Sequence, residues 1–503
     1  LMNIFPSILR NLLLLIFAFL NTIGFAQKDI KIEIDNYLQK TQKIFEVPGV
    51  AVGIVKDRKV IFAKGFGVQS LSKKTPVNEH SIFAIGSTTK AFTAAALGKL
   101  VESGEIQWDD RVIDFIPEFE LHDPAITNMF TIRDLLTHRS GLPRGDLLWF
   151  ASDFTRQDIL ERIRYLEPTF GYRAGFGYQN IMYLVAGQII PRVTGKSWDE
   201  YLKDNFFEPL NMNRTTSILS DIKKLENVAT PHQKLDNKLQ EIPWRNIDNV
   251  GPAGSINSSV NDMANWVIML LNEGIFNGKR ILKKETIDEL FMPQQIMRKE
   301  GRLGSYFPPV NFLTYGLGWF ISDFNGLKMV EHGGNIDGMH AQVSLVPELE
   351  LGMIFLSNSR NLMPEASRYH IVEIFANVEH QKDWGEHFLK VIEKAENLSE
   401  KSLNNIKQSR NKKTKPSLPL DHYAGIYSHP MYGDIKVVQK NKNLRIEGHK
   451  QFQGNSSHWH HNSFEVKWDQ SRLGTLIINF ELDAMGKVKG VEIPGKGFHV
   501  KIK

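Results

Sequence analysis

The pattern of apolar and polar positions divides the first part of the chain into helix, hairpin and helix. Apolar residues recur at helical spacing over residues 30–45, and two apolar runs, 49–55 and 60–63, flank a short charged turn. This order predicts a helix followed by a β-hairpin. An alanine- and leucine-rich segment, residues 87–103, then predicts a helix that begins at Ser87.

The middle of the chain reads mainly as helices, and strands return near residue 330. Helical spacing predicts helices at residues 132–137, 157–165, 181–193, 198–207 and 260–272. Short apolar runs predict strands at 329–331, 341–346 and 353–356, before a helix at 366–376. We expect residues 27–380 to form one domain, with helices between a starting hairpin and closing strands.

The tail has a different composition. Residues 401–420 hold six lysines or arginines, two prolines and no acidic residue, which is typical of a solvated linker. We expect a helical segment and basic linker at 381–415. Beyond it, short alternating segments separated by turn residues predict a C-terminal β domain, residues 416–503, with strands at 423–427, 434–438, 444–447, 464–468 and 476–480.

The first 26 residues have the features of a signal peptide. Arg10 is their only charge, an apolar run covers residues 12–20, and Gly24 and Ala26 are the small residues that a signal peptidase needs. We expect a mature chain from Gln27, secreted or in a bacterial periplasm, with no stable membrane span after cleavage. A retained anchor is the alternative, although the apolar run is about half of the roughly 20 residues that a span needs.

Composition excludes several classes of protein. The chain of 503 residues is 42% hydrophobic and 23% charged, which is ordinary globular content. Its net charge of +5 is too small to indicate a nucleic-acid partner. With no cysteine, it has no disulfide, thiolate metal site or cysteine nucleophile. His458 and His460 share a strand face, but no carboxylate lies close in sequence, so we expect no metal and no cofactor.

The strongest catalytic candidate is Ser87-Thr88-Thr89-Lys90. A catalytic serine needs a base within hydrogen-bond reach, and positions i and i+3 share one face of a helix. Three other Ser-x-x-Lys segments occur, but Ser87 alone follows a glycine at the start of a long apolar helix. Backbone N–H groups at a helix N-terminus favour developing negative charge. Burial would also make Lys90 lose its proton more readily. The alternative is an N-cap serine with a surface lysine.

Two further clusters carry candidate chemistry. Tyr178 and Asn180 lie in a glycine-rich segment that enters a helix. A tyrosine beside an ammonium group ionises more easily and relays the serine proton, while a carboxamide holds a substrate amide and the lysine. The segment from His332 to Asn335 follows a strand, and its paired glycines, Gly333 and Gly334, let a substrate backbone approach, so that the Asn335 N–H supplies an oxyanion donor. Taken singly, each cluster also fits ordinary turn packing.

These three clusters, in this order, resemble the penicillin-recognising serine hydrolases, specifically their class C β-lactamase-like branch. The resemblance covers roughly residues 30–378 and extends to segments 131–142, 207–212, 253–255, 315–319 and 356–358. It implies an α+β fold: an antiparallel sheet flanked by helices, a helical subdomain, and a small all-β domain after it. It also implies that Ser87 is acylated, Lys90 and Tyr178 transfer protons, Asn180 positions groups, and His332–Asn335 is the substrate edge.

One departure from that family affects the expected substrate. Members that hydrolyse penicillins usually have Lys-Thr-Gly where this chain has His332-Gly333-Gly334. An ammonium group holds a substrate carboxylate, and a neutral imidazole does so poorly. True β-lactamase activity is therefore not expected. Family members with histidine at this position include D-amino-acid-specific peptidases, and others are esterases, so the resemblance implies a peptide containing D-amino acids, or a small ester, as the substrate. A β-lactam substrate is an alternative, and so is a non-catalytic module that binds peptide or cell wall. A Ser-His-Asp triad through His138 or His332 also stays open, although the chain has no Gly-x-Ser-x-Gly motif.

Overall fold

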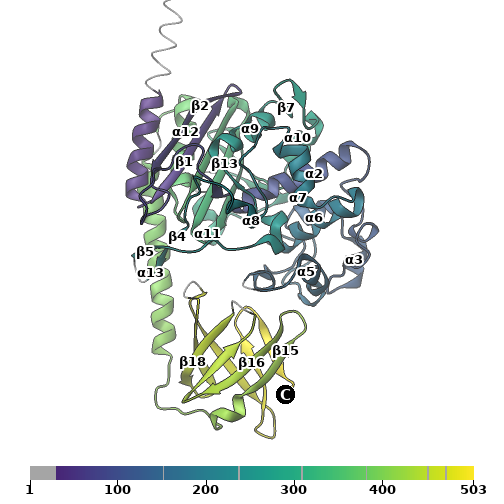
Figure 1. Ribbon diagram of the computed structural model, residues 1–503, viewed down its shortest axis with the longest axis vertical. Helices are drawn as coiled ribbons and strands as arrows, with labels where there is room; N and C mark the ends of the chain where they lie inside the picture. Colours follow the sequence, from purple (N-terminus) through teal and green to yellow (C-terminus); the bar gives the residue numbers. More distant parts are fainter. Residues whose placement is uncertain are drawn as a thin grey trace, which may run out of the picture.

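The computed structural model describes residues 30–503, except 151, 236–237, 308–309, 381, 450–451 and 471–472. The expected signal peptide lies outside the described residues. Figure 1 shows two parts: a sheet with helices around it, and a β-barrel, joined along one side by the long helix α13 (Trp384–Gln408). Within the described residues, no helix combines the length and apolar character needed to cross a membrane.

The first part is built on an antiparallel sheet. Its eight strands have the order β2-β1-β14-β13-β12-β11-β10-β9. In chain order they are β1 (Gly49–Lys56), β2 (Lys59–Gly67), β9 (Gln295–Ile296), β10 (Leu313–Tyr315), β11 (Phe320–Phe324), β12 (Leu327–Ile336), β13 (Met339–Val346) and β14 (Leu351–Ser357). The central strands β13 and β14 are buried along their whole length. β14 is almost continuously apolar, whereas β13 also buries His340, Gln342 and Ser344.

Helices cover both faces of this sheet, as the sequence predicts. On β1, Val50, Val52 and Ile54 point to a core shared with the helix at residues 30–44, with α12 (Met363–Ala376) and with the start of α13. Ala51 and Val55 point to the opposite core, shared with α2 (Thr89–Glu102) and α9 (Val260–Leu271). The alternation follows from the two-residue period of a strand.

A helical subdomain lies beside the sheet. Its helices begin at capping residues: Thr131 and Asp134 cap each other's backbone N–H groups at the start of α4, and similar pairs start α5 and α7. The remaining helices are α3 (Pro124–Met129), α4 (Ile132–Leu136), α5 (Arg156–Arg162), α6 (Asn180–Thr194), α7 (Trp198–Leu202), α8 (Leu219–Ile222), α10 (Lys284–Leu290) and α11 (Gly301–Tyr306). Three small antiparallel pairs complete this part: β3 (Phe83–Ala84) with β6 (Asn257–Ser258), β4 (His232–Leu235) with β5 (Lys238–Glu241), and β7 (Ile275–Phe276) with β8 (Lys279–Arg280).

The C-terminal part is a closed antiparallel barrel. Its strands are β15 (Gly425–His429), β16 (Gly433–Lys440), β17 (Asn443–Glu447), β18 (Gln453–His460), β19 (Ser463–Trp468), β20 (Thr475–Leu482), β21 (Val488–Ile493) and β22 (Gly497–Lys501). The sequence predicted five of them and missed β21 and β22. It noticed β18 only at its end, where His458 and His460 share a strand face, because the rest of that strand is rich in small polar residues. The predicted linker is also shorter than expected, since α13 continues to Gln408.

The barrel touches the helical subdomain near the loop of residues 143–148. Arg162 donates a hydrogen bond of 2.8 Å to the Pro430 carbonyl. Met431, in the β15–β16 turn, is buried in the same core as α6, and a Cβ at Gly145 would lie 3.5 Å from its terminal methyl group. The barrel therefore packs against the backbone of a loop that also faces the candidate site.

Candidate active site

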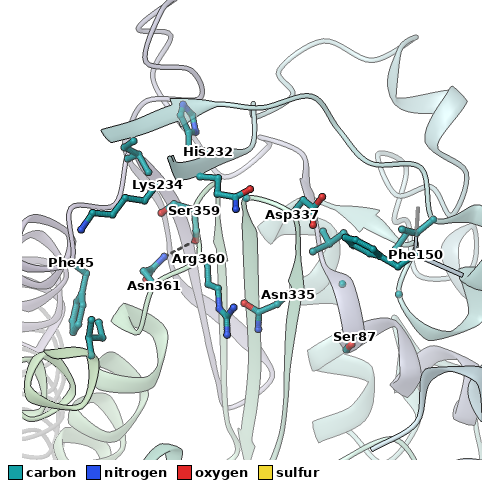
Figure 2. A pocket seen from close by; sticks show the side chains of 18 of the residues that line it. Phe45, Ser87, Phe150, His232, Lys234, Asn335, Asp337, Ser359, Arg360 and Asn361 are labelled. Atoms are coloured by element: carbon teal, nitrogen blue, oxygen red, sulfur yellow. Dashed lines mark hydrogen bonds between the residues drawn. The ribbon is translucent and has the colours of Figure 1, made fainter. Parts of the chain in front are cut away.

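Ser87 lies in a tight turn that leads into α2. Residues Gly86–Thr88 form a 3-10 turn, and Gly86 has φ of +52°, a conformation that favours glycine. Ser87 is half-buried and lines a cleft of about 880 Å³. The cleft runs between the helical subdomain, the end of the sheet and α13, and Figure 2 shows Ser87 at one side of it. The turn thus presents one hydroxyl to an open space large enough for a substrate.

Lys90 is one turn further along and is fully buried. Its Nζ lies 3.1 Å from Ser87 Oγ, 2.8 Å from Asn180 Oδ1 and 2.7 Å from the Ala253 carbonyl oxygen. Burial, and then the positive charge of Arg144, hold the Lys90 pKa well below its usual range, while Asp146 acts in the opposite direction. Lys90 is therefore buried, as predicted, and its pKa is shifted in the predicted direction.

Asn180 is held by its own hydrogen bonds. The Gln179 side chain accepts from the Ile181 N–H and starts α6, which sets Asn180 at the first position of that helix. Asn180 Nδ2 donates to Asp146 Oδ1 at 2.9 Å, and Arg144 Nε in turn donates to Asp146 Oδ2 at 2.5 Å. Because Asp146 accepts only from the NH₂ group, it fixes the amide so that Asn180 Oδ1 faces Lys90.

The ring of Tyr178 lies beside the Lys90 amine. Lys90 Nζ is 4.9 Å from the centroid of its ring, and the Tyr178 hydroxyl is hydrogen-bonded to Ser87. Burial raises the pKa of Tyr178 far above its usual range, although the bond to Ser87 and the charge of Arg144 lower it. The prediction of easier ionisation is therefore wrong, because desolvation outweighs the nearby positive charge. Tyr178 keeps its proton near neutral pH and is suited to donate it.

The edge of β12 lies against the turn that holds Ser87. A Cβ built on Gly334 would be 2.8 Å from the Ser87 backbone nitrogen, and one built on Gly86 would be 2.8 Å from the Asn335 nitrogen. Only glycine allows this close approach on both sides. The Ser87 nitrogen therefore lies close to the Gly334 backbone, and the Asn335 nitrogen lies close to the Gly86 backbone. This arrangement is typical of an oxyanion hole.

Comparisons with known proteins agree with this geometry. A family model described as "Beta-lactamase" matches residues 34–376, which is more than half of the chain. The chain belongs to the β-lactamase family. A second model, a domain of unknown function named DUF3471, matches residues 409–502, the region of the barrel.

Relatives of this β-lactamase-family chain include a fungal and a staphylococcal protein. It is 29% identical to "Unguisins hydrolase ungD" of Aspergillus violaceofuscus, over 79% of this chain and 74% of that protein. It is 27% identical to "Protein flp" of Staphylococcus aureus, over 66% and 63%. The octameric penicillin-binding protein homologue from Pyrococcus abyssi matches 93% of this chain with a TM-score of 0.63 and 22% identity. That likeness confirms the predicted fold.

His332, at the position of the family's usual lysine, is enclosed. Its ring is almost fully buried, Nε2 lies 3.0 Å from the Tyr315 hydroxyl, and Nδ1 lies 2.7 Å from the Gly333 carbonyl oxygen. Nδ1 therefore carries the proton and Nε2 accepts from tyrosine. Burial, and then the nearby Lys90, lower the His332 pKa to about 3. The sequence placed His332 among the substrate-binding residues, but its side chain has no free nitrogen to offer; Asn335, by contrast, lines the cleft.

His138 does not form a triad with Ser87. Its Nδ1 accepts from the Gln179 N–H at 3.1 Å, and its ring packs 4.2 Å from that of Tyr178. Burial holds the His138 pKa well below its usual range. The groups that meet the Ser87 hydroxyl are Lys90 and Tyr178. This family member therefore has the serine–lysine arrangement, and His138 supports the tyrosine ring.

Sequence reasoning missed Arg144, Asp146 and the carbonyl of Ala253. They belong to no short motif, and their importance comes from contacts made across the fold with Lys90 and Asn180. The segments around residues 131–142 and 253–255 were noticed only through the family resemblance. The sequence feature that could have pointed to Arg144 and Asp146 is their Arg-x-Asp spacing in a loop that contains proline and glycine.

One group in the described part of the chain has metal-ligand composition: Glu33, His370 and His380. His380 Nδ1 is hydrogen-bonded to Glu373 Oε2 at 2.8 Å, and its Nε2 lies 3.4 Å from Glu33 Oε1. The rings of His370 and His380 are stacked, with an angle of 16° between their planes. One ion cannot lie in both ring planes at once, so these residues fit an ion-pair cluster better than a metal site.

Proposed function

We propose that this protein is an exported serine hydrolase that cleaves an amide or ester through an acyl-enzyme on Ser87. The observation that carries the proposal is the environment of Lys90. A neutral amine has two N–H bonds and one lone pair. Asn180 Oδ1 and the Ala253 carbonyl can accept only from N–H groups, so they leave the lone pair for the third neighbour, the Ser87 hydroxyl.

The first half-reaction then follows from the contacts. Ser87 Oγ attacks the substrate carbonyl carbon while its proton passes to Lys90 Nζ, and the backbone N–H groups of Ser87 and Asn335 stabilise the oxyanion. As the tetrahedral intermediate collapses, the bond to the leaving group breaks. Tyr178 donates its hydroxyl proton to the departing nitrogen or oxygen and is reprotonated by Lys90. Lys90 is neutral again at the acyl-enzyme.

Water completes the cycle. Neutral Lys90 takes a proton from a water molecule that attacks the acyl carbon, and the second tetrahedral intermediate releases Ser87 with that proton returned. The acid product leaves and the site is restored. Each step uses only the acid–base groups already in contact with Ser87, so the proposed reaction needs no cofactor.

We further propose a peptide containing D-amino acids, or a small ester, as the substrate. The absence of a free cation at the position of His332 supports this over a β-lactam, because the usual anchor for a penicillin carboxylate is missing there. A relative named for hydrolysis of unguisins supports a substrate other than a β-lactam.

Intact-mass analysis tests the proposal. The purified protein is exposed to a fluorophosphonate and, separately, to penicillin, with Ser87→Ala as the matched control. We expect the fluorophosphonate adduct on the wild type and none on Ser87→Ala. A stable penicillin adduct at Ser87 would instead indicate a penicillin-binding peptidase. A folded wild type that takes up neither reagent would contradict the proposal and favour a binding module.

Export is proposed on the pattern of the first 26 residues alone. The full chain expressed in a bacterium should yield a periplasmic or secreted product. The mass of that product should be the mass of a chain that starts at Gln27. A product of full-length mass in the membrane fraction would indicate a retained anchor. A cytoplasmic product of full-length mass would contradict export.

A further inference from the structure

The turn between β15 and β16 leaves the barrel and enters the core of the first part. Met431 and Tyr432 are buried in the hydrophobic core that contains side chains of α2 and α6. The adjoining strand residues Tyr427 and Ile435 are buried instead in the separate core of the barrel. Turns between strands ordinarily run over the surface, because a buried turn leaves backbone polar groups without partners. We call residues 430–432 the anchor turn.

The barrel contacts the loop that carries Asp146 on both sides of that residue. A Cβ built on Gly145 would lie 3.5 Å from the terminal methyl group of Met431. A Cβ built on Gly495, in the turn between β21 and β22, would lie 2.9 Å from Leu147 Cδ1. Two separate turns of the barrel therefore pack against the chain neighbours of Asp146.

Further contacts hold the anchor turn in place. Arg162 on α5 donates a hydrogen bond of 2.8 Å to the Pro430 carbonyl, and its guanidinium carbon lies 4.2 Å from the centroid of the Phe154 ring. The same ring packs against His449, between β17 and β18, with 4.5 Å between the ring centroids. The anchor turn cannot move away from the helical subdomain without breaking these contacts.

Asp146 connects this interface to the catalytic amine. Its Oδ1 accepts a hydrogen bond of 2.9 Å from Asn180 Nδ2. Asn180 Oδ1 lies 2.8 Å from Lys90 Nζ, which in turn lies 3.1 Å from Ser87 Oγ. Misplacing catalytic groups by about 1 Å can cost about 100-fold in rate. A shift of the loop would therefore reach Ser87 through two hydrogen bonds and one buried amine.

We propose that Met431 is a positioning residue for catalysis: the anchor turn holds the loop so that Asp146 keeps the Asn180 amide turned toward Lys90. None of the described residues that line the cleft belongs to the barrel, so Met431 acts through the loop and not by touching the substrate. The barrel is then a part of the hydrolase and not an independent binding module. This inference rests on the proposed function, because it assumes that Lys90 is the base for Ser87.

The rate of fluorophosphonate labelling of Ser87 in the full chain tests this role. Met431→Ala removes most of the anchoring side chain, and we expect the rate to fall about 10- to 100-fold. Met431→Leu has nearly the same volume and should restore most of the rate. Leu444→Ala is the matched control, since it also truncates a fully buried side chain, but in the core of the barrel. It should leave the rate unchanged.

A double-mutant cycle shows whether Met431 acts through Asp146. Asp146→Ala removes the acceptor that fixes the Asn180 amide, so it should itself slow the labelling of Ser87. Adding Met431→Ala to Asp146→Ala should then slow labelling little further, because the loop no longer has that acceptor to place. Independent effects would multiply instead. A merely structural role of Met431 predicts the same slowing with and without Asp146.

Arg162→Gln is the second variant, in case Met431→Ala does not fold. It removes the hydrogen bond to the Pro430 carbonyl and leaves the buried side chain of Met431 in place. We expect a smaller slowing in the same direction, which Asp146→Ala again abolishes. Circular dichroism and thermal unfolding show which variants are folded and are compared on labelling rate.

The outcomes separate the two proposals. The positioning role is overturned if the folded anchor variants are labelled at the wild-type rate, if Leu444→Ala slows labelling equally, or if the effects multiply in the Asp146→Ala background. In each of these cases the wild type is still labelled and the hydrolase proposal stands. If the folded wild type is not labelled at all, the hydrolase proposal itself fails, and this inference with it.

Discussion

Lys90 Nζ lies 3.1 Å from Ser87 Oγ. It also donates hydrogen bonds to Asn180 Oδ1 and to the Ala253 carbonyl oxygen, which accept hydrogen bonds but are not bases. This relationship decides how the site works. An exposed lysine is charged near neutral pH, but a fully buried one that faces Arg144 loses its proton far more readily. The fold therefore favours the neutral form of the amine and holds it within hydrogen-bond distance of the nucleophile.

Replacing Lys90 by Met should abolish the base while keeping the volume of the side chain. We expect the rate of fluorophosphonate labelling to fall about 100- to 10,000-fold, the range for loss of a general base. Lys99→Met is the matched control, since Lys99 is on the same helix and its Nζ donates to the Ile281 carbonyl, away from Ser87. Equal labelling of Lys90→Met and wild type, with both folded by circular dichroism, would remove Lys90 from the mechanism.

Removing the two charged side chains beside Lys90, one at a time, should shift the pH dependence of Ser87 labelling in opposite directions. Arg144 lowers the Lys90 pKa, so Arg144→Gln should raise that pKa and move the acidic limb of the labelling rate to higher pH. Asp146 raises the Lys90 pKa, so Asp146→Asn should move the limb to lower pH. Labelling rates measured across pH for the three proteins check the signs. Shifts in the same direction would show that Lys90 is not the titrating group.

The contact between Gly334 and the turn of Ser87 should be intolerant of a methyl group. A Cβ on Gly334 would lie 1.9 Å from the Ile85 carbonyl oxygen, so Gly334→Ala must push β12 away from the turn. We expect a loss of about 100- to 1,000-fold in acylation rate, as for removal of an oxyanion donor. Gly171→Ala, whose Cβ has an ordinary contact at 3.5 Å, should be neutral. An active Gly334→Ala protein would argue against the oxyanion role of this edge.

A buried ion pair behind β12 should matter for stability. Arg368 Nε lies 2.9 Å from Glu331 Oε2, and both side chains are almost fully buried. Removing one partner leaves a buried charge without compensation, so Arg368→Met should lower the free energy of unfolding by about 3–5 kcal/mol. Arg58→Met, which breaks an exposed pair with Glu350, should cost at most about 1 kcal/mol. Urea unfolding followed by tryptophan fluorescence compares the two variants, and equal losses would contradict this reasoning.

The sequence predicted those parts of the structure that are encoded locally. Helical spacing located α2, α6 and α9 to within a few residues. Apolar runs located β1 and β14, and the mixed segment 341–346 located β13. Most of strand β18 was missed, apart from its end at His458 and His460, because small polar residues such as Ser456 give little apolar signal, although this residue is buried in the barrel.

The site was predictable where chemistry follows from short motifs, as for Ser87 and Lys90. It was not predictable where a role depends on contacts across the chain. Asp146 orients Asn180 from 34 positions away in sequence. The state of Tyr178 was misjudged because charge is visible in a sequence but the extent of desolvation is not.

The most direct test of the central claim is the pH dependence of Ser87 labelling by a fluorophosphonate, in the wild type and in Lys90→Met. We predict that the wild-type rate rises to a plateau at a pH well below about 10.4, the usual lysine pKa, and that this rise disappears in Lys90→Met. A wild-type rate that rises only near that usual value, or an unchanged profile without Lys90, would contradict a neutral Lys90 as the base.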